Sequence, residues 1–251
     1  MSEIIAFPAG GYRFLRGVFQ YSAGVAALDG HCIERVRFAA PIPLERGFAR
    51  IAEHLRAAGR PPSAFCACEL RSPAPFDEVG FAAFNRRYVG VLESWGLRAA
   101  DANPVARSNV CPERDRPPEP SFHAFCYTVP AAGAAPSFVV AGSGEAPEGK
   151  SSYADHIVAR GDLSPAGLRR KAVWVMDEME RRMAALGAGW AAATAAQVYS
   201  VHDIHPFLAD LLVARGAARH GVTWHYARPP VVELEYEMDC RGVAAERVLA
   251  G

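Results

Sequence analysis

The sequence predicts an α+β protein made of two tandem units of similar architecture. An alanine–arginine pair leads into a strand-like run in each half, at Arg107 and again at Arg228. The elements upstream of each arginine also follow the same order. A small, proline-bracketed stretch at residues 131–136 separates the two halves and is typical of a linker. We therefore predict an N-terminal unit over residues 1–130 and a C-terminal unit over residues 137–251.

The first unit begins with an apolar run over residues 17–24, which predicts a strand. A helix pattern ending at Gly59 follows, and its apolar positions are Phe48, Ile51, Ala52, Leu55 and Ala58. Residues 64–71 predict the next strand. A second helix then leads to the strand that carries Arg107.

The second unit repeats this order. Residues 136–144 predict its first strand, and a helix pattern ends at Gly187, with apolar positions at Leu168, Ala172, Val175, Met176, Met179 and Met183. Residues 195–201 predict the following strand, and a second helix again precedes the arginine, here Arg228. The shared order favours two βαβαβ-type units.

Composition limits the classes of protein to consider. The 251 residues are 51% hydrophobic and 22% charged, which suits two ordinary domains. Lys+Arg and Asp+Glu are equal at 27 each, and basic residues do not cluster with aromatics, so we expect no nucleic-acid partner. No apolar run approaches the roughly 18 residues of a membrane span, and the N-terminus lacks a basic leader, so we expect a cytoplasmic protein.

The six cysteines are scattered and include no Cys-x-x-Cys pair. Such cysteines are typical of buried free thiols in a reducing compartment. His202 and His205 have a spacing that resembles a metal-ligand pair, but no third ligand set is evident near them. We therefore expect no metal site.

Arginine in a repeated position matters because its planar fork pairs with a carboxylate through two parallel hydrogen bonds. Arg107 and Arg228 are candidate clamps for a substrate carboxylate, and a surface ion pair is the alternative for each. His225 lies close to Arg228 in sequence and is a candidate for the same pocket. Arg71, at the end of the strand over residues 64–71, is a further candidate for substrate binding.

The predicted strand over residues 231–239 alternates strictly, with Glu233, Glu235, Glu237 and Asp239 on one face. A solvated strand face explains this pattern equally well. Crowded carboxylates, however, have raised pKa values that suit proton transfer. We select Glu233 or Glu235 as the catalytic acid/base.

The segment Gly142-Ser143-Gly144-Glu145 follows a strand but lacks the lysine of a P-loop. It is typical of a turn where backbone amides approach a small ligand. Ser143 is thus a candidate for substrate binding, and Glu145 is an additional candidate acid.

Several short motifs in shared order resemble the reactive intermediate deaminases, the RidA or YjgF proteins. The first half supplies Tyr21-Ser22-Ala23-Gly24, Ala58-Gly59, Phe84-Asn85-Arg86-Arg87-Tyr88 and Val105-Ala106-Arg107-Ser108. The second half supplies Ala141-Gly142-Ser143-Gly144, Leu186-Gly187, Ala227-Arg228 and Val232-Glu233-Leu234-Glu235.

The resemblance implies a chorismate-mutase-like fold in each half, a mixed sheet with two helices packed on one face, and a homotrimer with clefts at its interfaces. It also implies that Arg107 or Arg228 binds the substrate carboxylate, that Asn85 lines a cleft, and that an acid at or near Glu233 positions water. His123 stands near the expected acid of the first half. Because each half departs from the pattern, a composite site is expected.

Tandem members of this superfamily include the larger 2-aminomuconate deaminases, which this chain resembles in length and layout. The resemblance implies a hydrolytic deaminase without a cofactor. Its partner would be a small enamine or imine dicarboxylate, such as 2-aminomuconate or its chloro derivative. Two alternatives stay open: a non-catalytic module that binds a metabolite, and a metal-assisted hydrolase that uses His202 and His205.

Overall fold

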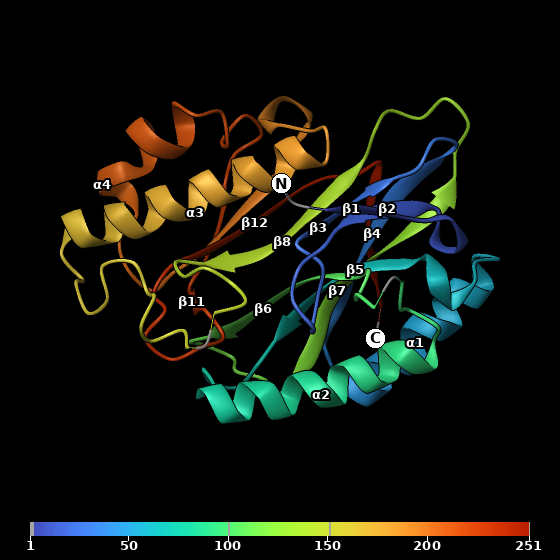
Figure 1. Ribbon diagram of the computed structural model, residues 1–251, viewed down its shortest axis with the longest axis horizontal. Coiled ribbons are helices and arrows are strands. Elements are labelled where there is room, and N and C mark those ends of the chain that lie inside the picture. Colours follow the sequence, from blue (N-terminus) through green and yellow to red (C-terminus); the bar gives the residue numbers. More distant parts are fainter. Residues whose placement is uncertain (1–2, 100, 151, 251) are drawn as a thin grey trace.

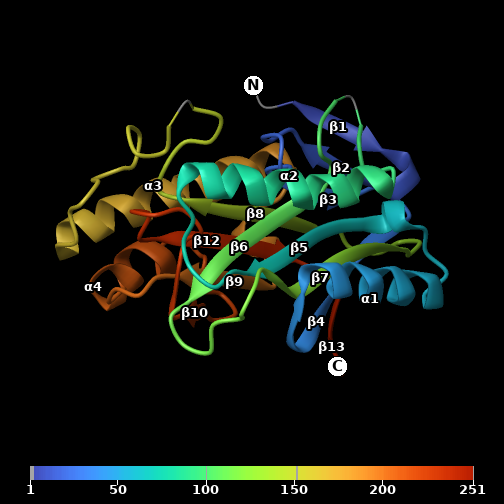
Figure 2. The ribbon, with the colours of Figure 1, turned by 90° about the horizontal axis from the view of Figure 1, so that it is seen from below.

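The computed structural model describes residues 3–99, 101–150 and 152–250. Two mixed β-sheets lie against each other, with α3 outside one sheet and α1 and α2 outside the other (Figure 1). Figure 2, seen from the side of α1 and α2, shows these two helices in front of the strands. Among the described residues, no helix is both long and apolar enough to span a bilayer.

The first sheet has seven strands in the order β1-β2-β3-β8-β12-β9-β10. Their bounds are Ile4–Phe7, Tyr12–Leu15, Gly24–Ala27, Phe138–Gly144, Glu237–Gly242, Ala195–Tyr199 and Thr223–His225 in that order. Only β9 and β10 pair in parallel. This sheet therefore combines three strands of the first half with four of the second.

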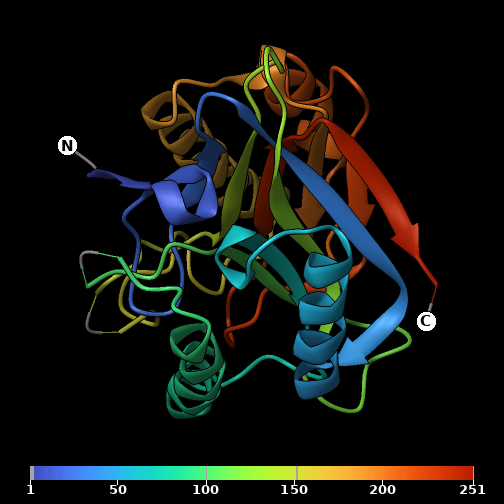
Figure 3. The ribbon, with the colours of Figure 1, turned by 90° about the vertical axis from the view of Figure 1, so that its right-hand side faces the viewer.

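The second sheet has six strands in the order β11-β6-β5-β7-β4-β13. Their bounds are Ala227–Arg228, Ala106–Pro112, Phe65–Arg71, Ser121–Pro130, His31–Pro43 and Ala245–Leu249 in that order. The chain end returns to the first half here, because β13 pairs in parallel with β4 (Figure 3).

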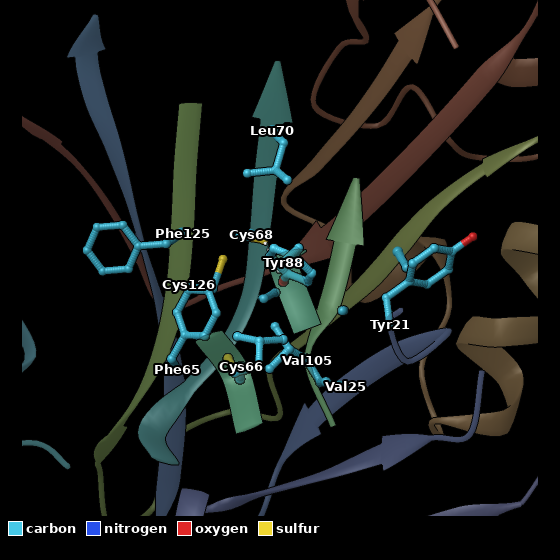
Figure 4. Close-up of a cluster of buried hydrophobic side chains, with 14 of the residues drawn as sticks. Tyr21, Val25, Phe65, Cys66, Cys68, Leu70, Tyr88, Val105, Phe125 and Cys126 are labelled. Atoms are coloured by element: carbon cyan, nitrogen blue, oxygen red, sulfur yellow. Dashed lines mark hydrogen bonds between the residues drawn. The ribbon is translucent and has the colours of Figure 1, made fainter. Parts of the chain in front are cut away.

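The helices are α1 at Leu44–Ala57, α2 at Glu78–Ser94, α3 at Pro165–Ala185 and the short α4 at His205–Phe207, which continues into a π-helical stretch at Leu208–Val213. Short 3-10 turns lie at Pro8–Gly10, Pro62–Ala64 and Trp190–Ala192. The apolar face of α3 covers the first sheet, where Val175, Met176 and Met179 are fully buried. The second sheet packs against α1 and α2 through aromatic rings, for example Phe48 against Phe122 at 4.8 Å. Figure 4 shows part of this second core, with Tyr21 at its border and its hydroxyl turned away.

The predicted fold of two tandem RidA-like units is wrong. Each sheet takes strands from both halves, so neither half forms a sheet of its own. Residues 131–136, the predicted linker, lead from β7 in one sheet to β8 in the other. The division of the chain into independent domains at this point stays a prediction.

Two predicted strands also differ from the structure. Residues 17–23 form isolated bridges and turns, and β3 begins only at Gly24. In the segment over residues 231–239, regular pairing begins at Glu237, because Glu233 has φ of +71° and the backbone amides of Glu235 and Tyr236 donate to Glu145 instead of a strand.

The acidic face of β12 points between the two sheets rather than into solvent. Ser108 Oγ of β6 donates to Asp239 Oδ2 at 2.5 Å, which joins the sheets across their interior. A buried ion pair between Arg35 and Glu69, at 2.6 Å, belongs to the same polar layer. The opposite face of β12, with Met238 and Cys240, packs in the core under α3.

Candidate active site

Arg107 is a buried cation without a carboxylate partner. It lies on β6 and is 3% exposed. Its Nη2 donates to Asn85 Oδ1 at 2.8 Å, while its Nη1 has no hydrogen-bond partner among the described residues. No carboxylate of the described chain forms an ion pair with Arg107. Since a buried charge is costly unless it is paired, the site favours an anion from outside the chain.

Helix α2 supplies most of the surroundings of this guanidinium. Asp77 caps the helix by accepting a hydrogen bond from the Gly80 amide. One face of the helix then presents, at helical spacing, Phe81, Phe84, Asn85 and Tyr88. The centre of the Arg107 guanidinium lies 4.8 to 5.9 Å from the centroids of the three aromatic rings on that face, and 5.1 Å from that of Tyr21. These rings stabilise the cation and exclude water from it.

Glu237 is the acid that shares the cavity with Arg107. It begins β12, is 3% exposed, and its side chain makes no hydrogen bond or ion pair within the described residues. Burial raises the pKa of this carboxyl well above its usual range, and Asp239 and Glu145 raise it further, whereas Arg71 opposes the shift. The raised pKa favours the protonated form of the Glu237 carboxyl.

A pocket lies between these two residues, and its empty space of about 430 Å³ includes a part that is open to solvent. Both sheets line it, since Arg107 and Asn109 come from β6 and Gly142 and Glu237 from β8 and β12. Its apolar wall includes Phe81, Ala146, Val231 and Leu234. The cavity thus brings together a cation, a buried carboxyl with a raised pKa and an apolar wall.

A buried ionic network holds the loop after β8 against this cavity. Tyr21 donates its hydroxyl to Glu148 at 2.8 Å, and Arg182 of α3 donates to the same carboxylate at 2.9 Å. Arg182 is 1% exposed and also bonds Glu178 at 2.7 Å. Glu148 and Tyr21 both line the cavity. The wall is therefore positioned by contacts from the first half and from α3 together.

The structure brings together two of the residues selected from the sequence, Arg107 and Asn85. Arg228 lies elsewhere, 36% exposed in its side chain, where it pairs with Glu113 and with Glu235 at 3.0 Å. Glu235 also lies 2.7 Å from His202. These residues form an ion-pair cluster away from the lining of the cavity.

The other selected acids have partners of their own. Glu233 is exposed and pairs with Arg160 at 2.7 Å. Glu145 is fully buried, 3.2 Å from Lys171 Nζ, and accepts the amides of Glu235 and Tyr236 at 2.7 and 3.0 Å. Burial raises the pKa of Glu145 against the opposing effect of Lys171. Neither carboxyl lines the cavity.

Three further selected residues also lie outside the cavity lining. Ser143 bonds the buried Arg182 at 3.4 Å. His225 stacks on Tyr199 at 5.0 Å, and burial, followed by Arg71, lowers its pKa to about 4. Arg71 is buried, with its guanidinium 5.5 Å from the Tyr199 ring. Within the described residues, no group of three or more His, Cys, Asp or Glu could hold a metal ion.

Sequence reasoning did not select Glu237, Asn109 or Tyr21. Two signals pointed to the first two. Glu237 belongs to the alternating acidic face, which we expected to supply the acid, and Asn109 lies two positions after Arg107 on the same strand and so faces the same side. Tyr21 belongs to a motif that carries the family resemblance, but nothing in the sequence placed it beside Arg107. Its approach to Arg107 depends on the bridge between Ser22 and Ala106.

The family model of the 2-aminomuconate deaminase CnbZ matches residues 4–247. The chain belongs to this family. One relative is the 2-amino-5-chloromuconate deaminase of Comamonas testosteroni. It is 52% identical over 251 residues, and the match covers 99% of this chain and 100% of the relative.

Two solved structures are similar to this chain. A chorismatase crystal structure superposes with a TM-score of 0.52 at 12% identity, covering 93% of this chain and 77% of the other. A cyanuric acid hydrolase from A. caulinodans gives a TM-score of 0.43 at 14% identity, covering 85% of this chain and 67% of the other. The likeness to the chorismatase concerns the fold alone. This likeness and the observed strand order both contradict the predicted fold of two tandem RidA-like units.

Proposed function

We propose that the chain is a hydrolytic deaminase of a 2-aminomuconate-type substrate, an enamine that carries two carboxylates. One observation carries this proposal: a buried guanidinium that has no counter-anion among the described residues and a buried carboxyl with a raised pKa line the same cavity. Membership of the 2-aminomuconate deaminase family and the name of the 52% identical relative support the choice of substrate. A homotrimer and a cytoplasmic location stay predictions.

Arg107 binds the substrate carboxylate next to the amine-bearing carbon. Its Nη2 is already held by Asn85, so the guanidinium is oriented before the substrate arrives and Nη1 points to the bound anion. The surrounding aromatic rings keep water away, which strengthens the charge pairing. Carboxylate binding also draws electron density from the adjacent carbon and favours addition to it.

Glu237 transfers the protons. As a neutral acid it protonates an alkene carbon conjugated with the amine, and the enamine becomes an iminium ion. The resulting carboxylate then removes a proton from water, whose oxygen adds to the carbon that bears nitrogen. The carbinolamine collapses to a ketone and ammonia. A raised pKa suits this exchange between acid and base. The sequence of steps consumes one water and needs no group beyond these side chains.

Ammonia release tests the proposal. Purified protein, treated with a chelator, is incubated with 2-aminomuconate while ammonia and diene absorbance are followed. We expect one ammonia for each diene lost, at a rate above that in buffer. Glu237→Gln should lower kcat by about 10²–10⁴-fold. The matched control is Glu53→Gln, at an exposed glutamate of α1 that pairs with Arg50.

The assay also separates the proposal from the alternatives. Saturable binding of 2-aminomuconate with ammonia release at the buffer rate would make the chain a binding module. Loss of activity on chelation, restored by a divalent metal, would favour a metal-assisted hydrolase. Either result contradicts the proposed chemistry.

A further inference from the structure

Two buried hydrogen-bond donors in the cavity have no acceptor. Besides Arg107 Nη1, the amide Nδ2 of Asn109 has no hydrogen-bond partner among the described residues, although Asn109 is only 3% exposed. Ser72 Oγ donates to Asn109 Oδ1 at 2.9 Å, so the amide oxygen has a partner while the NH₂ group has none among the described residues. Both residues line the cavity that contains Glu237. Buried donors are almost always paired, so two orphans in one cavity indicate a ligand with two acceptors.

The chemistry of a 2-substituted acid supplies such a pair. Its carboxylate accepts from Arg107, and an oxygen on the neighbouring carbon accepts from Asn109. The amino group of an enamine is itself a donor and satisfies Asn109 poorly. Glu148 also lines the cavity and accepts from Tyr21 and Arg182 through one oxygen, Oε1. The NH₂ group of Asn109 is itself a donor, and it is complementary to an oxygen rather than to an amino group on that carbon.

We infer that the same cavity catalyses a second reaction, the conversion of a 2-hydroxy-diene dicarboxylate, the hydroxyl analogue of the amine substrate, into its 2-oxo form. Arg107 binds the carboxylate, Asn109 binds the oxygen on the next carbon, and Glu237 supplies the proton. This inference rests on the site proposed for deamination but requires neither water addition nor loss of ammonia.

The step balances without a further reactant. The carboxylic acid of Glu237 transfers its proton to an alkene carbon conjugated with the enol, and a C–H bond forms there. The π electrons shift so that the C–O bond becomes a carbonyl. The enol O–H bond breaks, and its proton returns to the Glu237 carboxylate, directly or through water. The net reaction is an isomerisation, and no atom is oxidised or reduced.

The test uses 2-hydroxymuconate and the full-length protein. Loss of the dienol absorbance is followed against the spontaneous rate, and the product formed in D₂O is examined for deuterium at its new C–H bond. We expect at least a 100-fold faster reaction than in buffer and deuterium on one face only. Glu237→Gln should reduce the rate to that of buffer. Asn109→Leu should lower kcat/KM at least 10-fold, and Glu53→Gln is the control.

The outcomes separate this inference from the proposed deaminase. Spontaneous ketonisation with deuterium on both faces, in a preparation that releases ammonia from 2-aminomuconate, overturns the inference and leaves the deaminase standing. Stereospecific ketonisation without ammonia release supports the inference and overturns the deaminase. Full ketonisation by Glu237→Gln overturns the role of this acid. If Glu237→Gln does not fold, the inference is still tested by the face selectivity of the unmodified protein and by the kcat/KM of Asn109→Leu.

Discussion

Glu237 Oε1 occupies the place where a side chain on Gly142 would begin. An ideal Cβ at residue 142 would overlap this oxygen and would lie 3.2 Å from Ser108 Cα. Gly142 and Glu237 lie on the neighbouring strands β8 and β12. The absence of a side chain at residue 142 therefore allows the acid to lie in the cavity beside Arg107.

We predict that Gly142→Ala displaces the Glu237 carboxyl and lowers kcat about 100-fold, because a shift of about 1 Å in a reacting group costs that much. The overlapping atom is the end of a flexible side chain, so the variant should fold. Steady-state kinetics and thermal unfolding check both points. An unchanged kcat would show that the position of Glu237 does not matter for turnover.

Replacement of Arg107 should separate stability from activity. Arg107→Met removes a buried cation that has no carboxylate partner among the residues the structure describes, and apolar replacements of buried charged groups are often stabilising. We expect the free energy of unfolding to rise by about 1–2 kcal/mol, while kcat/KM falls on the order of 10²-fold because the substrate carboxylate loses its partner. Urea unfolding and kinetics measure the two effects.

The control for this variant is Arg50→Met, at an exposed arginine paired with Glu53, where both quantities should change little. A strongly destabilised but active Arg107→Met protein would mean that the arginine has a structural role.

The raised pKa of Glu237 predicts how stability depends on pH. The unfolded chain releases this proton near pH 4.3, whereas the folded chain keeps it to much higher pH. Between the two pKa values the folded state binds more protons, so the free energy of unfolding declines as the pH rises. The glutamine of the Glu237→Gln variant cannot ionise, so the free energy of unfolding of this variant should decline less with pH. Asp239 and Glu145 also have raised pKa values, and their contributions to the decline should remain.

Thermal midpoints of both proteins from pH 5 to pH 8 measure this difference. The midpoint of the unmodified protein should fall more than that of the Gln variant. Parallel curves would show that Glu237 ionises normally in the folded state.

The buried pair of Lys171 and Glu145 should be structural. Lys171 Nζ lies 3.2 Å from Glu145 Oε1 and donates to the Val158 carbonyl at 2.9 Å. Lys171→Met leaves a buried carboxyl without its cation and should lower the free energy of unfolding by about 3–5 kcal/mol. The control on the same helix is Arg169→Met, whose exposed pair with Asp210 contributes little. A loss of less than about 1 kcal/mol would show that Glu145 does not depend on Lys171.

Local periodicity predicted individual elements well. The strand expected over residues 64–71 is β5 at Phe65–Arg71, and the patterns ending at Gly59 and Gly187 are α1 and α3. Helix period and terminating glycines are encoded by adjacent residues, so one sequence suffices to find them. The pairing of strands is not encoded in this way. Strand β3 pairs with β8 and β13 pairs with β4, in each case across the two halves, and no local pattern specifies these pairings.

The candidate site shows the same limit. Arg107 was found because its motif recurs, and Asn85 because of the family resemblance. The acid was expected on the correct alternating face, but Glu233 and Glu235 precede the regular strand, where φ of +71° at Glu233 changes the direction of the chain. Whether that face met solvent or the second sheet depended on tertiary packing, which the alternation alone does not reveal.

Binding and turnover of 2-aminomuconate by Glu237→Gln test the central claim most directly. Arg107 remains in this variant, so it should bind the substrate with a Kd close to that of the unmodified protein. With no proton to transfer, it should release ammonia about 10²–10⁴-fold more slowly than the unmodified protein in a single-turnover experiment. Ammonia release at the unmodified rate would contradict the pairing of a carboxylate clamp at Arg107 with an acid at Glu237.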